Sequence, residues 1–467
     1  MDELAFVPAT EQARLVRERE VSPVELVELY LERIERLDTA SDPVLGAFVT
    51  VRGDEALAEA RQKADGPAEA PFHGVPISLK DLDTTAGIRT TYSSQAFEDH
   101  VPDFDLAHVR RLKDAGFVVL GKTNTPEFGT TAFTDSPLNG PCRTPWDLTR
   151  NAGGSSGGAA ASVAAGLSPI AQGSDGGGSI RIPASCCGVF GIKASRGRVS
   201  NAPFVPGIGL GTTGPLARTT ADAAAYLDLV AGYEWGDPFP LPAPERPFAA
   251  EIGADPGRLR IALTTTPPFD TPVDERCAAA ARDAADLLTE LGHEVEEATP
   301  DWGGAGVMDD FRPVWQVTPA FYPLSDPSVL TSLNQAFLQR AHEATSVEHA
   351  AAVGRLQLRA RATVAFWADH DLLLTPTLAM PPMPLGWETE PDDPWEQFDR
   401  AAAFTPFTAV FNVTGQPAVS LPLHWTDDGL PIGVQLVGPP LGEALLFRIS
   451  SQLEAARPWA DRRPPHC

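Results

Sequence analysis

Apolar residues recur at helical spacing near the start of the chain, between residues 22 and 37. Ser22 is of a type that caps helices, Pro23 fits a first helical turn, and Glu25 completes a capping box with Ser22. We therefore predict a helix from Ser22 to Leu37, whose periodic positions are Leu26, Leu29, Tyr30, Arg33 and Leu37.

After residue 71 the pattern changes to short apolar runs bounded by Gly and Pro, which is typical of buried strands. An amphipathic stretch at 105–115 precedes one such run, and a helical stretch at 277–291 separates two others. This alternation predicts an α/β fold whose sheet uses both ends of the sequence. The predicted strands are 75–79, 117–120, 170–172, 259–264, 294–297, 372–374, 418–421 and 432–437, and a closing helix begins at Glu443.

Two proline-rich stretches, 236–258 and 375–394, interrupt this alternation. Proline removes a backbone donor, so these stretches predict extended connectors. We predict four segments: an N-terminal helical layer at 1–65, a core at 66–240, a variable region at 241–400, and C-terminal strands and a helix at 401–467 that complete the sheet.

Composition excludes several classes of protein. Hydrophobic residues make up 43% of the 467 residues and charged residues 21%, which favours a folded, globular chain over a disordered one. The net charge of −26 argues against nucleic-acid binding and against a basic membrane-binding patch. Because no run approaches the roughly 20 apolar residues that span a bilayer, and no signal peptide is recognisable, we expect a cytoplasmic protein.

The five cysteines form no CxxC pair and no zinc-like spacing, and their odd number fits a reducing compartment. We expect Cys186 and Cys187 to be small buried apolar residues. The nine histidines contain no HExxH pattern. We therefore expect no metal and no cofactor.

Glycine is concentrated in residues 151–181, on both sides of a small-residue stretch. A flexible linker does not normally enclose an Ala-rich helix and a strand-like run. A phosphate-binding loop is disfavoured because Ile192 precedes Lys193 where a Walker motif needs Gly. The GxGxxG match at 209–214 runs into Pro215 instead of a helix, so we interpret it as a chance match.

Nucleophilic catalysis by serine is the remaining interpretation of this segment. Gly153–Gly157 satisfies GxSxG, which would make Ser155 the nucleophile together with a distant histidine, but residues 144–151 look polar and turn-like instead of forming the expected strand. Ser179 is better placed, because it follows three glycines whose backbone amides can converge on an oxyanion. Each such donor contributes roughly 3–4 kcal/mol to an acyl transfer.

A general base is the other requirement of that chemistry. Lys80 ends the apolar run GVPISLK, an unusual place for a long charged side chain unless it reaches a cavity, although most lysines extend to solvent. To act as a base, it must be neutral, so its pKa must fall from about 10.4 towards 7. Burial has this effect, and strand alternation should turn the neighbouring Asp81 away.

Together these motifs resemble those of the amidase signature family of serine hydrolases. The resemblance rests on GVPISLKD, GGSSGG, GSDGGGSIRIPASCCGVFGIK, GPLARTTADA and GLPIGVQLVGPP, and covers most of residues 70–230 and 405–455. It implies a mixed central sheet covered on both faces by helices, and hydrolysis of C–N bonds through an acyl-enzyme.

The resemblance also implies a role for individual residues. Ser179 matches the acylated nucleophile, Ser155 the bridging serine with a cis peptide bond, and Lys80 the base. Asp175 and Arg181 match positions that support the loop. The implied oxyanion hole comprises Gly176, Gly177 and Gly178 with the amide of Ser179.

Two departures from the family pattern concern the pocket. Gly176 stands where the family often has Thr or Ile, so we expect a more flexible loop, and Tyr92 replaces a smaller residue, so we expect it to reshape the pocket. The region 300–400 holds five of the nine tryptophans and is our candidate for the pocket wall, although most of them individually should pack in the core. They are Trp302, Trp315, Trp367, Trp387 and Trp395.

The expected substrates are small aryl or alkyl amides, and by the same chemistry esters and carbamates (urethanes). We expect a monomer or a homodimer. An alternative is the glutaminase subunit of a tRNA-dependent amidotransferase, although no residues for the charged ends of glutamine are identifiable. A catalytically silent binding protein is a third reading, which the presence of Lys80, Ser155 and Ser179 disfavours.

Overall fold

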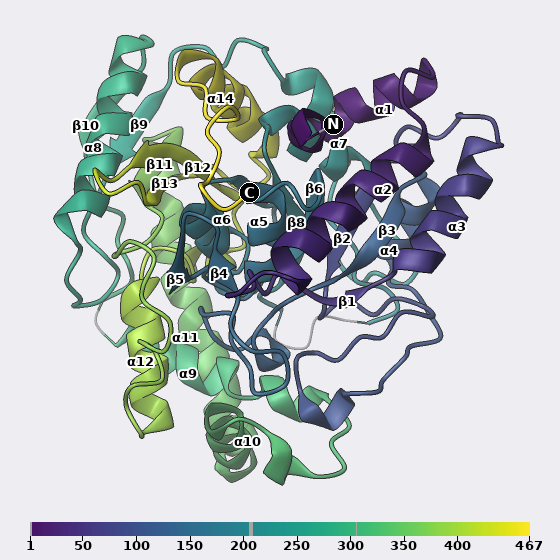
Figure 1. Ribbon diagram of the computed structural model, residues 1–467. Coiled ribbons are helices and arrows are strands. Elements are labelled where there is room, and N and C mark those ends of the chain that lie inside the picture. Colours follow the sequence, from purple (N-terminus) through teal and green to yellow (C-terminus); the bar gives the residue numbers. More distant parts are fainter. Residues whose placement is uncertain (1, 205–208, 305) are drawn as a thin grey trace.

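One mixed sheet of eleven strands runs through the computed structural model, which describes residues 2–204, 209–304 and 306–467 (Figure 1). From one edge to the other, the strands are β1 (Phe48–Val51), β3 (Val118–Thr123), β2 (Pro76–Lys80), β6 (Ile170–Asp175), β8 (Thr212–Ala217), β7 (Phe190–Lys193), β12 (Ala418–Trp425), β13 (Pro431–Val437), β11 (Leu372–Pro376), β9 (Arg260–Leu263) and β10 (Glu294–Glu297). The pairs β2–β3, β2–β6, β9–β10 and β9–β11 are parallel and the others antiparallel.

Helices surround this sheet in the described part of the chain. They are α1 (Ala9–Arg17), α2 (Pro23–Ile34), α3 (Gly53–Ala64), α4 (Ala107–Asp114), α5 (Gly157–Ala164), α6 (Arg181–Cys187), α7 (Thr220–Val230), α8 (Glu275–Glu290), α9 (Val307–Trp315), α10 (Ser332–Glu343), α11 (Ser346–Val364), α12 (Pro394–Phe404), α13 (Val410–Thr414) and α14 (Glu443–Ala456).

Alternate side chains of the strands enter two separate cores, one on each face of the sheet. Along β3, Val119 belongs to one core, whereas Val118 and Leu120 belong to the other. In β6, Ile170 and Ala171 divide in the same way, as successive strand residues must. Helices α1, α4, α7, α8 and α14 cover the first core, and α2, α3, α5 and α6 cover the second. The predicted fold, a mixed central sheet covered on both faces, is confirmed.

A third core lies among α9, α10, α11 and α12, where Phe311, Trp315, Phe337 and Phe398 are buried. Figure 1 shows these helices, drawn in green, gathered at one end of the molecule. The predicted variable region therefore contributes these helices, which pack on one another beside the sheet, and also the strands β9, β10 and β11 of the sheet itself.

Two local predictions differ from the structure. Residues 144–151 are not a polar turn: β5 (Asp147–Asn151) pairs with β4 (Arg143–Thr144) in a separate two-stranded ribbon. Polar residues are tolerated in β5 because its side chains are largely not buried. Helix α2 has the predicted capping box at Ser22 and Glu25, but it gives way to a π-helical turn, Glu35–Thr39.

The cysteines agree with a further expectation. Cys186 and Cys187 are completely buried in α6, and burial raises the pKa of both thiols. All five cysteines are free. Among the described helices, none is both long and apolar enough to cross a membrane.

Candidate active site

Lys80, the predicted base, is the last residue of β2 and is completely buried. Its Nζ atom donates to Ser155 Oγ at 2.7 Å and to Ser174 Oγ at 3.1 Å. The side chain therefore reaches across the sheet to two hydroxyl groups. The contact with Ser155 joins two of the three predicted catalytic residues. Sequence reasoning did not identify Ser174 as a partner, although it directly precedes Asp175 in the glycine-rich motif.

Burial lowers the pKa of Lys80 to about 7, against the opposing charges of Asp83 and Asp175. This is the direction and the cause that the sequence predicts. The neighbouring Asp81 points elsewhere, since its carboxylate accepts hydrogen bonds from the backbone N–H and the hydroxyl of Thr91. A lysine with a pKa near neutrality can give up and take back a proton during turnover.

Ser155 lies in the loop between β5 and α5, directly after a cis peptide bond that joins it to Gly154. A side chain at Gly154 would collide with the backbone of Ala132, whose carbonyl carbon lies 2.9 Å from an ideal Cβ position. The backbone of this loop at Gly154 therefore packs directly against the backbone of Ala132. Within the described residues, no hydrogen bond joins Ser155 to a histidine, the contact that the GxSxG alternative would need.

Ser179, the predicted nucleophile, lies between β6 and α6. Its carbonyl accepts from the backbone N–H of Ser156 at 3.1 Å, which ties the two serine-containing loops together. Ser155, Ser174 and Ser179 all line one cavity of about 850 Å³, called the large cavity below. Two of the three predicted catalytic residues thus line one space, and the third, Lys80, is hydrogen-bonded to Ser155.

Two of the three glycines predicted to form the oxyanion hole line spaces that Ser179 also lines. Gly176 lines the large cavity, and Gly177 lines a separate small recess of about 70 Å³. The N–H of Gly178 instead donates to Asp175 Oδ1 at 2.8 Å, so it is not available to an oxyanion, and the prediction for Gly178 is revised. Gly178 has a φ of +131°, and a side chain there would collide with Thr408.

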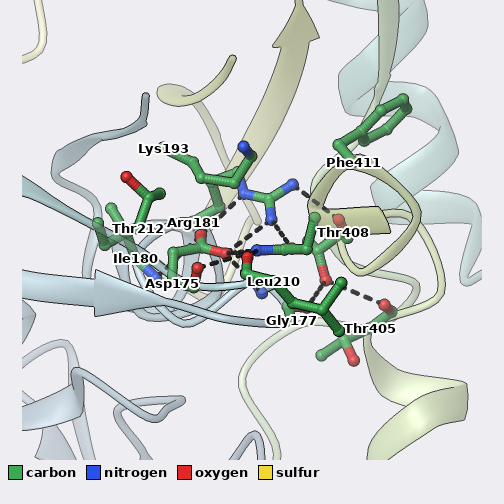
Figure 2. Close-up of polar contacts among 12 residues, drawn as sticks. Asp175, Gly177, Ile180, Arg181, Lys193, Leu210, Thr212, Thr405, Thr408 and Phe411 are labelled. Atoms are coloured by element: carbon green, nitrogen blue, oxygen red, sulfur yellow. Dashed lines mark hydrogen bonds and ion pairs between the residues drawn. The ribbon is translucent and has the colours of Figure 1, made fainter. Parts of the chain in front are cut away.

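A buried ion pair between Asp175 and Arg181 supports this loop (Figure 2). Arg181 donates from Nη2 to Asp175 Oδ1 at 2.9 Å and from Nε to Oδ2 at 3.0 Å. Asn412, 237 residues away in sequence, donates to Asp175 Oδ1 at 2.8 Å. Although burial opposes ionisation, the charge of Arg181 lowers the pKa of Asp175 to about 2. Asp175 and Arg181 therefore support the loop, as their motif positions suggested.

The expectation that Gly176 loosens the loop stays a prediction. An ideal Cβ at Gly176 would lie 3.3 Å from Trp315 Cη2, so a side chain there would be tight against the indole. The missing side chain therefore makes room for an aromatic neighbour.

Only one of the five tryptophans in region 300–400 lines a cavity that contains Ser179. That residue is Trp315. Trp302 and Trp367 contact Phe411 at ring distances of 6.3 and 6.4 Å, and the remaining two also pack against phenylalanines. This agrees with the expectation that most of them serve the core.

Aromatic residues from several segments of the chain form much of the wall of the large cavity. Tyr92 lines it, as its position in the sequence suggested, and packs against Tyr322 at a ring distance of 5.1 Å. Tyr322 in turn stacks on Phe128 at 4.2 Å. Sequence reasoning missed Phe104 and Phe204, which line the cavity as well. Both lie in loops, where no hydrophobic periodicity marks them.

Within residues 2–204, 209–304 and 306–467, no group of three or more His, Cys, Asp or Glu side chains is arranged to hold a metal ion. The predicted catalytic residues instead combine hydroxyl groups with one buried amine. This donor set suits proton transfer between oxygen and nitrogen atoms.

Comparison with known sequences identifies the family of this chain. The family model named Amidase matches residues 25–303 and 316–447. The chain belongs to the amidase family. It is 39% identical to the 6-aminohexanoate-cyclic-dimer hydrolase of Paenarthrobacter ureafaciens over 98% of this chain and 96% of that protein. It is 34% identical to an acylamidase of Rhodococcus erythropolis over 99% and 98% of the two chains.

Solved structures of amidases have the same fold. A 6-aminohexanoate cyclic dimer hydrolase superimposes with a TM-score of 0.92 at 37% identity, covering 99% of both chains. A glutamyl-tRNA(Gln) amidotransferase subunit from Thermotoga maritima is more distant, with a TM-score of 0.76 at 29% identity over 97% and 95% of the chains. The predicted amidase signature resemblance is confirmed, and the chain is a hydrolase of C–N bonds other than peptide bonds.

Proposed function

We propose that this amidase is a serine amidohydrolase in which Ser179 is the nucleophile, Ser155 the bridging group and Lys80 the base. The observation that carries the proposal is the 2.7 Å contact between Lys80 Nζ and Ser155 Oγ, made by a buried amine whose pKa is about 7. Ser179 lines the same cavity as Ser155, and Gly176 of its loop lines that cavity too.

The reaction then follows from these positions. Neutral Lys80 accepts a proton from Ser155 while Ser155 accepts one from Ser179, whose Oγ atom attacks the carbonyl carbon of the substrate. The amides of Gly176, Gly177 and Ser179 stabilise the negative charge on the carbonyl oxygen. The intermediate collapses, the amine leaves with a proton returned through Ser155, and an acyl-enzyme remains. Water, deprotonated by the same relay, releases the acid and restores Ser179.

The substrates that we propose are small, uncharged amides with aryl or alkyl groups, and esters and carbamates (urethanes) that react by the same steps. The aromatic wall of the large cavity, with Tyr92, Phe128 and Tyr322, supports an apolar substrate. Two relatives, named acylamidase and 6-aminohexanoate-cyclic-dimer hydrolase, support the amide class. The glutaminase alternative is less well supported, because the amidotransferase subunit is the more distant structural neighbour.

For the setting of this reaction we propose a cytoplasmic monomer or homodimer that binds neither nucleic acid nor membranes. The five free cysteines support a reducing compartment. The net charge of −26 supports the absence of phosphate-binding surfaces.

A fluorophosphonate probe followed by mass spectrometry tests the assignment of the nucleophile. We expect one modified residue, Ser179, and neither labelling nor turnover after Ser179→Ala. Lys80→Ala should reduce kcat/KM by about 10²- to 10⁴-fold, the usual contribution of a general base. Replacement of any single histidine should leave substantial activity.

The opposite pattern would support the GxSxG alternative. Labelling of Ser155, turnover that survives Ser179→Ala, and loss of activity in one histidine variant would together contradict the proposal. A panel of anilides, carbamates and glutamine then separates the substrate classes. Turnover of glutamine alone would favour the glutaminase reading.

A further inference from the structure

Trp315 is the only residue besides Ser179 that lines both the large cavity and the small recess, among the described residues. The indole is fixed on several sides. Its Nε1 donates to the carbonyl of Thr130 at 3.0 Å, and the ring stacks on Phe311 at a centroid distance of 5.4 Å and an interplanar angle of 21°. Trp315 is therefore a rigid wall between two spaces that meet at the nucleophile.

The two spaces differ in size and in charge. The large cavity has about 850 Å³ and includes Asp83, Asp103 and His100 in its wall, whereas the recess has about 70 Å³. Among the residues that the structure describes, no charged one lines the recess, whose wall includes Phe269, Met308, Phe311, Phe398 and Ala402. A group that enters the recess must therefore be short and uncharged, because a buried unpaired charge is costly.

The positions of the hydroxyl groups decide which part of a substrate enters each space. The leaving amine must come within hydrogen-bond reach of the group that returns its proton, which in the proposed mechanism is Ser155. Ser155 lines the large cavity and does not line the recess. The amine therefore occupies the large cavity, and the acyl group on the other side of the carbonyl is left to face the recess.

We infer that the recess is the acyl subsite of this amidase, that it takes short uncharged acyl groups, and that Trp315 sets its size. This inference rests on the proposed function, since it takes Ser179 as the nucleophile. Gly176 is part of the same arrangement, because a side chain there would be tight against the indole: an ideal Cβ would lie 3.3 Å from Cη2 and 3.4 Å from Cζ3.

The first experiment compares 4-nitroanilides of acetic, butyric, hexanoic and octanoic acid. For the wild-type chain we expect kcat/KM to fall at least about tenfold between the butyryl and octanoyl compounds, since one methylene too many in a closed pocket already costs roughly 10-fold or more. Trp315→Ala joins the two spaces and should raise the octanoyl-to-butyryl ratio at least about tenfold. Trp315→Phe, which keeps a ring against Phe311, should raise it less.

Trp395→Ala is the matched control, because Trp395 lies in the same region, packs on Phe337 and lines neither space at Ser179. Its octanoyl-to-butyryl ratio should equal that of the wild type. In a second series, the acetyl group is kept and the amine is changed from aniline to naphthylamine. Trp315→Ala should change the naphthylamide-to-anilide ratio of kcat/KM by no more than about threefold, because the amine lies in the large cavity and not in the recess.

The results separate this inference from the proposed function. Turnover that persists in Ser179→Ala overturns the proposed function itself. If turnover depends on Ser179, but Trp315→Ala and Trp315→Phe both bind the fluorophosphonate probe and keep the wild-type acyl ratio, only the subsite assignment is overturned. A change in the amine ratio without a change in the acyl ratio overturns the orientation of the substrate.

A double-mutant cycle tests the role of Gly176. Gly176→Ala should lower kcat/KM for the acetyl compound in the wild-type background, because the added methyl group displaces the indole. In the Trp315→Ala background the same change should cost at least about tenfold less, since the opposing atoms are gone. Equal costs in both backgrounds would show that the two residues act independently and would contradict the coupling.

Discussion

Lys80 determines the pH dependence of the proposed reaction, because only its neutral form accepts a proton. Burial lowers its pKa to about 7, so the active form is lost as the pH falls below that value. We predict that kcat/KM for an uncharged anilide falls about tenfold per pH unit below pH 7 and is level above it. Stopped assays between pH 5 and 9 measure this profile.

Lys193 is a matched control for that profile. It is also buried with a pKa lowered to about 7, mainly by burial, but its Nζ donates to the carbonyl of Ala194 and not to a serine. Lys193→Met should therefore keep the acidic limb near pH 7. Loss of that limb in Lys193→Met would contradict its assignment to Lys80.

The low pKa of Lys80 also has a cost in stability. The ordinary value is 10.5, so between pH 7 and 10.5 the unfolded chain binds a proton that the folded chain does not. The free energy of unfolding contributed by this residue therefore rises with pH across that range. We predict that Lys80→Met unfolds at a higher urea concentration than the wild type at pH 7. The advantage should shrink by pH 10, and an equal advantage at both pH values would contradict the explanation.

Single residues were predictable from the sequence where a motif marks them and not where contacts cross the chain. Lys80, Ser155 and Ser179 each stand in a motif; the two serines line one cavity, and Lys80 is hydrogen-bonded to Ser155. Ser174 follows no pattern of its own. The N–H of Gly178 donates to Asp175, and a side chain at Gly178 would collide with Thr408, 230 positions later. No local sequence pattern reveals either contact.

At the scale of elements, the turn from β6 into α6 depends on the pair Asp175 and Arg181. Arg181→Met would leave a buried carboxylate without its partner, which typically costs about 3–5 kcal/mol. We predict a loss of that size in the free energy of unfolding, measured by urea denaturation, together with loss of probe labelling at Ser179.

A second variant separates the charge from the packing. Asp175→Asn combined with Arg181→Met removes both charges, so it should recover part of the stability that Arg181→Met loses. A double variant no more stable than Arg181→Met would show that the unpaired charge is not the cause.

Elements with strong hydrophobic periodicity or apolar runs were predictable from the sequence. Elements that form only by pairing with another polar segment were less predictable. The helix after Ser22 and the strands β2, β3 and β6 lie where apolar spacing puts them. The ribbon of β4 and β5 was missed because its residues are polar and its pairing is made across a tight turn. Such pairing depends on backbone hydrogen bonds, which hydrophobic patterns do not record.

At the scale of the molecule, the alternation of helix and strand predicted the fold class but not the order of the strands. β7 pairs with β12, more than 200 positions later, and β11 with both β9 and β13. Which strands become neighbours depends on packing on both faces of the sheet, and local sequence does not determine it. The four predicted segments remain a prediction, and one sheet crosses three of their boundaries.

Because that sheet links both ends of the sequence, we predict one cooperative unfolding transition. Tryptophan fluorescence reports mainly on region 300–400, which holds five of the nine tryptophans, whereas far-ultraviolet circular dichroism reports on the whole chain. The two thermal curves should coincide. An earlier fluorescence transition would mean that the helices α9 to α12 unfold separately.

The contact between Gly176 and Trp315 has a consequence for how this amidase can change under selection. A side chain added at 176 is tight against the indole, and a smaller residue at 315 would relieve that contact. Lineages in which the tryptophan is replaced can therefore accept bulk in the loop more readily. The residues found at the two positions should vary together among descendants of this chain.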